Sequence, residues 1–225
     1  VLAVIGAALD EYLSAHGEQP EAPLVALCPM SIRSESDDSA TTQVSAVYVR
    51  LGDPGVNPGR RLRQVVDSST ASKASVSSMS ATAMMDYGVI MFALLELLGR
   101  SKLDQIIAPS YNVLVSNVPG PGNDAMYLNG SRMVASYPIS TLLPGVNLNV
   151  TLLSHGNTLD FGLLGDRRAL PDLGLVAEGI ESHFAAMEKE ILKQKPRTPR
   201  KAPVKKARPK RKAQANRAKP KRKAG

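Results

Sequence analysis

The sequence has 225 residues, and its charge is divided between two parts of the chain. All 20 acidic residues lie at or before Glu190, whereas 16 of the 28 lysines and arginines lie between Lys193 and Lys223, so residues 1–192 carry −8 and residues 193–225 carry +16. The first part is long enough to bury the core of one domain, and the single cysteine, Cys28, excludes an intramolecular disulfide.

The first fifty or so residues predict a helix followed by two strands. Apolar side chains recur at helical spacing over residues 1–13, and Gly17 follows where a helix commonly ends. A strand is predicted at residues 23–32 and a second at residues 43–51. The segment between them, residues 34–42, is polar and acidic, which is typical of a surface loop.

Two helices are predicted next along the chain. The first runs from Arg60 to about Ser80. The second, Met84–Leu98, is apolar nearly all round, which favours a buried core helix or, alternatively, a surface that meets lipid or an acyl chain. It spans 15 residues and contains Asp86 and Glu96. A membrane-spanning helix needs roughly 20 apolar residues, so we predict no transmembrane segment.

The remainder of the first part predicts strands connected by turns. An alternating apolar run from Tyr111 ends at Pro119-Gly120-Pro121, and further strands are predicted at Arg132–Tyr137, Leu148–Leu153 and Thr158–Leu163. The Gly156-Asn157 pair between the last two fits a hairpin turn, since both residues tolerate positive φ.

A final helix is predicted from Asp172 to Leu192. We expect it to pack on the sheet through one apolar stripe formed by Val176, Ile180, Phe184, Met187 and Ile191. Strands beside long helices predict an α/β fold with a mixed open sheet packed with helices. Residues 193–225, rich in Lys, Arg, Pro and Ala, are predicted to form a disordered basic tail, because they offer too little apolar surface to offset the entropy of ordering.

Polar residues at strand ends are the candidate binding residues. Ser116 and Asn117 end the strand before the Pro-Gly-Pro turn, and the missing side chain of Gly120 would let a ligand approach the backbone. Alternatively, these residues only cap the strand and stabilise the turn.

Three further polar residues, Asn147, Asn149 and Thr151, alternate with apolar ones and therefore share one side of their segment. In a buried sheet such side chains need hydrogen-bond partners. They could line a substrate channel or face solvent, and the sequence leaves both possibilities open.

The Ser116–Pro121 run, Ser-Asn-Val-Pro-Gly-Pro, resembles the C-terminal half of bacterial wax ester synthase/acyl-CoA:diacylglycerol acyltransferases. Residues Leu148–Ser154, Leu159–Leu163 and Asp166–Asp172 continue the likeness, which extends from Val1 to about Leu192. The resemblance implies a chloramphenicol acetyltransferase-like subdomain and transfer of an acyl group from acyl-CoA to a diacylglycerol or a long-chain alcohol. Acyl-CoA would be the cosubstrate, with no metal or prosthetic group.

The resemblance also implies a catalytic His-His-x-x-x-Asp-Gly motif, which this sequence lacks: its three histidines, His16, His155 and His183, are isolated. We assign no catalytic residue and expect the general base on an N-terminal half, which would make this chain a fragment or one product of a split gene. By analogy with the superfamily, Ser116 and Asn117 would donate hydrogen bonds to the thioester carbonyl where negative charge develops. The isolated chain should then have negligible activity.

The basic tail, residues 193–225, predicts a polyanionic partner. An anionic membrane or lipid-inclusion surface is one candidate, which would place the protein in the cytoplasm, peripheral to the inner membrane or lipid inclusions. Nucleic acid is another. The competing functional hypothesis is a non-enzymatic, acyltransferase-like scaffold whose tail binds DNA or anionic lipid, and a tail that only adds solubility remains a third interpretation.

Overall fold

The chain divides into two units, Val1–Gln194 and Lys195–Gly225. The computed structural model describes residues of the first unit only, in these ranges: 1–31, 44–78, isolated positions between 83 and 97, and 110–193 apart from 121, 123 and 124. The predicted loop at residues 34–42, most of the predicted helix Met84–Leu98 and the tail beyond Lys193 lie outside the described residues. Within that described part, no helix is long and apolar enough to cross a membrane.

A mixed five-stranded sheet organises the unit, in the spatial order β2-β1-β3-β6-β7. Strands β1 and β3 and strands β3 and β6 pair in parallel, whereas β1 with β2 and β6 with β7 are antiparallel. The strands span β1 Val25–Ser31, β2 Val44–Arg50, β3 Val113–Pro119, β6 Leu148–His155 and β7 Thr158–Gly165. The mixed open sheet predicted from the sequence is confirmed, as is the hairpin between β6 and β7.

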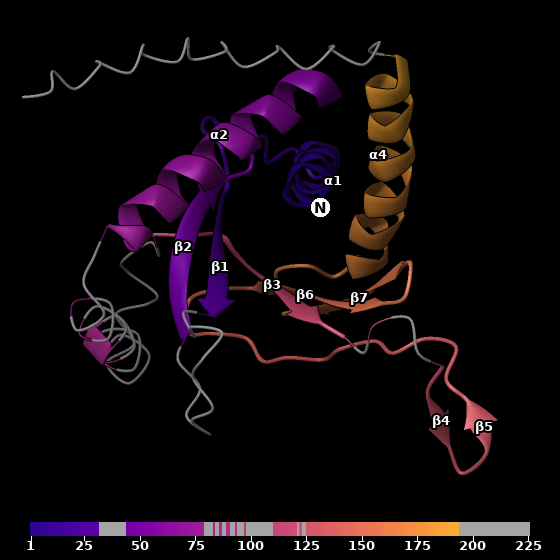
Figure 1. Ribbon diagram of the computed structural model, residues 1–225. Coiled ribbons are helices and arrows are strands. Elements are labelled where there is room, and N and C mark those ends of the chain that lie inside the picture. The colour runs from indigo at the N-terminus through magenta and orange to yellow at the C-terminus, as the bar shows by residue number, and fades with distance from the viewer. Residues whose placement is uncertain are drawn as a thin grey trace, which may run out of the picture. The chain divides into compact units, whose positions relative to one another are not determined.

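Three helices lie on one side of this sheet, and Figure 1 shows α1 between the other two. They span α1 Leu2–Ala15, α2 Pro58–Ser77 and α4 Leu173–Lys193. Helix α2 begins where the sequence supplies two start signals. The side chain of Asn57 accepts a hydrogen bond from the Arg60 amide at 2.9 Å, and Pro58 occupies the first helical position.

The main core lies between the helices and the sheet. Alternate residues of the central strands point into it, because side chains alternate across a strand. The buried strand residues include Val47, Val49, Val113, Val115, Val150 and Leu152. Gly6 lets α1 approach the sheet closely, since a Cβ there would lie 2.6 Å from the Leu51 carbonyl oxygen.

The opposite face of the sheet is crossed by residues 133–146. The amide of Ser136 donates to Asp160 Oδ2 at 2.8 Å, and a Cβ on Gly162 would lie only 1.6 Å from the Pro138 carbonyl oxygen. A second apolar cluster around Leu27, Tyr111 and Val146 lies apart from the main core. The segment between β3 and β6 is thus a packed cover for the sheet.

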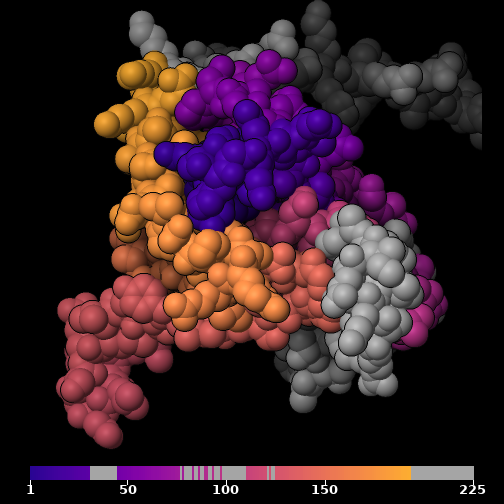
Figure 2. All heavy atoms as spheres, turned by 180° about the vertical axis from the view of Figure 1, so that it is seen from behind, coloured from indigo at the N-terminus to yellow at the C-terminus, as the bar shows by residue number. Residues whose placement is uncertain are grey.

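The strand predicted at Arg132–Tyr137 is wrong. The structure has instead a short hairpin of β4, Tyr127–Leu128, and β5, Ser131–Arg132, turning through Asn129 and Gly130 at positive φ. Beyond β5 the Ser136 amide donates to the side-chain carboxylate of Asp160 on β7 and not to a backbone carbonyl group of a strand. Leu128 is 79% exposed, and Figures 1 and 2 both show the hairpin projecting from the unit.

The last helix is confirmed, but the packing predicted for its stripe is wrong. Val176, Ile180 and Met187 are buried, whereas Phe184 is 53% exposed and Ile191 is also exposed. Helix α4 packs chiefly against α1 and touches β7 only lightly. The reason is the close crossing of the two helices. A Cβ on Gly179 of α4 would lie 3.1 Å from the Ala8 Cβ of α1, so the small residues at this crossing allow the two helices to pack closely.

Candidate functional site

Ser116 and Asn117 lie at the end of β3 but point to opposite sides of the sheet. In the parallel register Ser116 is paired with Thr151 and Asn117 with Leu152. Leu152 belongs to the core beneath the helices, so Asn117 is on the helix side, where its side chain is exposed. Ser116 is half-buried on the opposite side. Two adjacent strand residues cannot both contact one ligand on a single face.

The turn after β3 is fastened to the hairpin between β6 and β7. The Gly120 amide donates to Ser154 Oγ at 3.2 Å, and the Gly156 amide donates to the Gly122 carbonyl oxygen at 2.8 Å. A Cβ on Gly120 would lie 1.9 Å from the Ser154 carbonyl oxygen. Packing alone therefore requires glycine at position 120. A ligand approach at this position stays a prediction.

Asn149 and Thr151 form a buried polar pair on the side of the sheet that faces residues 133–146. Asn149 is 1% exposed, and its Nδ2 donates to the Thr141 carbonyl oxygen at 2.8 Å. The Thr151 hydroxyl donates to Asn149 Oδ1, also at 2.8 Å. The pair thus fixes the covering segment in place. Asn147 lies just before β6, with an exposed side chain and a carbonyl oxygen that accepts from the Asp166 amide. Substrate contact by these three residues stays a prediction.

The histidines take part in local contacts. His16 caps the end of α1, with its Nδ1 donating to the Tyr12 carbonyl oxygen at 2.8 Å. His183 Nε2 lies 2.7 Å from the Glu11 carboxylate and joins α4 to α1. His155 ends β6. In the part of the chain that the structure describes, no group of His, Cys, Asp and Glu residues is arranged to hold a metal ion.

The environment of Cys28 disfavours its thiolate. Burial raises the pKa of the thiol to about 11, although the positive charge of Lys73 opposes that shift. A thiol with so high a pKa is almost entirely protonated near neutral pH, and the thiolate is the nucleophilic form. Cys28 is therefore a packing residue of β1.

Arg61 is a structurally important residue that sequence reasoning missed. Its side chain is buried, with Nη1 donating to the Leu51 carbonyl oxygen at 2.8 Å and Nη2 donating to the Asp53 carbonyl oxygen at 3.0 Å. Nη2 also pairs with the Asp10 carboxylate of α1. The only signal in the sequence is Gly52. In the structure its φ is +91°, and its backbone lies close to the Arg61 side chain. Arg61 thus joins α1, α2 and the loop after β2.

A single mixed sheet with helices on one side and a packed cover on the other defines an α/β domain. Its sequence from residue 41 to residue 188 matches the WS/DGAT C-terminal domain. The chain belongs to this family. The resemblance inferred from the Ser116–Pro121 run is therefore confirmed.

Individual relatives agree with the family match. A protein of Mycobacterium tuberculosis (strain ATCC 25618 / H37Rv) that is named as a diacylglycerol O-acyltransferase is 38% identical over 179 residues, covering 78% of this chain and 36% of the relative. A second from the same strain is 34% identical over 191 residues, covering 85% of this chain and 42% of the relative. The solved structure of the wax ester synthase/diacylglycerol acyltransferase from Marinobacter aquaeolei VT8 is 28% identical, with a TM-score of 0.69, over 84% of this chain and 42% of that one. The chain spans less than half the length of these relatives.

Proposed function

We propose that this domain is the C-terminal half of an acyltransferase that moves an acyl group from acyl-CoA to a diacylglycerol or a long-chain alcohol. The products would be a triacylglycerol or a wax ester. The observation that carries this proposal is the match of relatives named as diacylglycerol O-acyltransferases over most of this chain. The general base would lie on an N-terminal half, because this sequence has no His-His-x-x-x-Asp-Gly motif.

The end of β3 is the proposed contribution of this half to the site. Donors placed where negative charge develops stabilise the transition state of acyl transfer, and removal of one such donor typically costs about 100- to 1,000-fold in rate. Asn117 is exposed and Ser116 half-buried, on opposite sides of the sheet. Only one of them can therefore donate a hydrogen bond to a given carbonyl group. Asn149 and Thr151 would contribute by holding residues 133–146 in place.

Radiolabelled acyl-CoA and diacylglycerol would test the proposal. The chain would be assayed alone and together with the part of the mycobacterial relative that precedes its matched region. We expect no triacylglycerol from the chain alone and product from the pair. Asn117→Ala and Ser116→Ala in the pair would identify the donor. Turnover by the chain alone would contradict the placement of the base, and an inactive pair would favour the non-enzymatic scaffold.

The basic tail supports a second part of the proposal. Sixteen lysines and arginines with no acidic residue follow Leu192. Clustered basic residues bind anionic lipid surfaces with about 1 kcal/mol for each residue near the surface. We propose that the tail holds the enzyme in the cytoplasm at the inner membrane or at lipid inclusions, where neutral lipid substrates gather. Binding of duplex DNA through the same charges is the competing possibility.

A further inference from the structure

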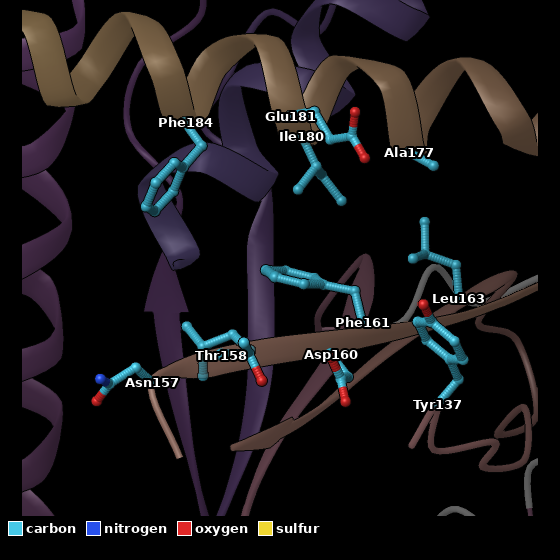
Figure 3. A pocket seen from close by; sticks show the side chains of 11 residues that line it. Tyr137, Asn157, Thr158, Asp160, Phe161, Leu163, Ala177, Ile180, Glu181 and Phe184 are labelled. Atoms are coloured by element: carbon cyan, nitrogen blue, oxygen red, sulfur yellow. The ribbon is translucent and has the colours of Figure 1, made fainter. Parts of the chain in front are cut away.

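An apolar slot lies between the edge strand β7 and helix α4. Its volume is about 640 Å³, within the range of roughly 300 to 1,000 Å³ that is usual for ligand pockets. Figure 3 shows Ile180 and Phe184 of α4 facing Phe161 of β7, with Leu163 pointing towards Ala177. The slot exists because α4 packs against α1 and leaves part of its apolar stripe facing an uncovered part of the sheet.

The charges around the slot restrict the ligand that it can take. Among the residues that the structure describes, its lining contains no lysine, arginine or histidine, and its acidic residues are Asp160 and Glu181. The Asp160 carboxylate points away from the slot and accepts the Ser136 amide. Glu181 is exposed on α4, where a carboxylate would repel a fatty-acid anion but accept a hydrogen bond from a hydroxyl group.

One end of the slot lies next to the candidate site. Asn157 and Thr158 form that end, at the turn of the β6–β7 hairpin. The adjacent Gly156 amide donates to the Gly122 carbonyl oxygen, so this turn is in contact with the turn that follows β3. A hydrocarbon chain held in the slot would therefore have one of its ends near the end of β3.

From this arrangement we infer that the slot between β7 and α4 binds the hydrocarbon chain of a neutral lipid alcohol and discriminates against fatty-acid anions through Glu181. The choice of an alcohol as ligand rests on the proposed acyltransfer function. The site itself rests on the facing apolar walls and on the Glu181 carboxylate.

A fluorescent reporter can be placed inside the slot without interference. The sequence contains no tryptophan, so Phe184→Trp in the full chain places a single tryptophan in the wall, and its emission can be excited apart from that of the tyrosines. Titration with decanol should shift its emission to shorter wavelength and saturate. Decanoate at neutral pH should bind about fivefold more weakly at low salt, because its charge lies near the exposed Glu181 carboxylate.

Two substitutions in this reporter protein test the mechanism. Glu181→Lys should reverse the preference, strengthening decanoate binding by at least about tenfold while changing decanol binding less than about threefold. Its control is Asp67→Lys, which makes the same change of charge at an exposed position of α2, the helix that packs on β2 at the other edge of the sheet. This control should change neither decanol binding nor decanoate binding. Ala177→Phe fills the slot and should abolish the decanol response, whereas Ala186→Phe on an exposed part of α4 should preserve it.

The outcomes separate this inference from the proposed function. If decanol leaves the emission of the reporter unchanged while circular dichroism shows that the reporter is folded, the proposed binding of hydrocarbon chains in the slot is wrong. Equal affinities for decanol and decanoate, or equal effects of Glu181→Lys and Asp67→Lys, would overturn the role of Glu181. None of these measurements depends on turnover, so a negative result would not contradict the acyltransferase proposal. Equally, an inactive enzyme would not contradict ligand binding in the slot.

Discussion

Gly120 shows how one missing side chain sets the geometry at the end of β3. A Cβ there would lie 1.9 Å from the Ser154 carbonyl oxygen, so the Gly120→Ala chain must separate the turn from β6. We expect the free energy of unfolding to fall by about 1–3 kcal/mol, the usual cost of overpacking. Gly122→Ala is the matched control, since nothing lies within 4 Å of its Cβ. Equal stabilities of the two variants in urea unfolding would contradict this explanation.

Arg61 provides a second test at the scale of single residues. Arg61→Met would leave the Asp10 carboxylate and three backbone carbonyl oxygens without their donor. Removing one partner of a buried ion pair typically costs about 3–5 kcal/mol. The control is Arg60→Met, whose side chain is exposed and lies 3.9 Å from Asp53, and which should cost less than about 1 kcal/mol. Thermal or urea unfolding of both variants measures the difference.

Residues with strong local signals were predictable from the sequence. Local residue patterns identified β2, β3, β6 and β7, and the Gly156-Asn157 pair identified a hairpin, because these features depend on neighbours along the chain. The buried state of Asn149 and Arg61 could not be read in the same way. Their partners lie on other elements, at Thr141 for Asn149 and at Asp10 for Arg61.

Among the elements, the segment of residues 133–146 acts as a cover for β6 and β7. Gly162→Ala would place a Cβ against the Pro138 carbonyl oxygen and displace this cover. We expect the Ser136 amide, which donates to Asp160, to lose its protection against hydrogen exchange. Gly174→Ala has open space around its Cβ and should leave the exchange unchanged. Retained protection of Ser136 in the Gly162 variant would show that the segment adapts without moving.

The errors of prediction also belong to the scale of elements. The stripe of α4 was identified correctly, but its orientation depends on the Gly179–Ala8 crossing, which no pattern within α4 contains. The strand predicted at Arg132–Tyr137 fails for a similar reason. Its Ser136 amide is taken by Asp160, a residue of another strand. Local pattern gave the type of element, and tertiary contacts decided what each element touches.

At the scale of the whole molecule, the separation of charge predicts salt-sensitive binding. The full chain should float with vesicles containing phosphatidylglycerol and not with neutral phosphatidylcholine vesicles, because only the former attract the +16 segment. Deleting residues 193–225, or raising the salt from about 0.1 M to 1 M, should abolish flotation, since the screening length falls from about 10 Å to 3 Å. Equal binding to both vesicles would contradict tethering, and stronger binding to duplex DNA would favour the scaffold.

The projecting hairpin of β4 and β5 has a practical consequence. The Met133 amide donates to the Met126 carbonyl oxygen at 2.8 Å, so the chain leaves and rejoins the domain at adjacent points. Its tip, Asn129-Gly130, is exposed. Exposed loop tips of this kind tolerate inserted sequence. A peptide tag placed between these two residues would give a handle for immobilisation that leaves both ends of the chain free.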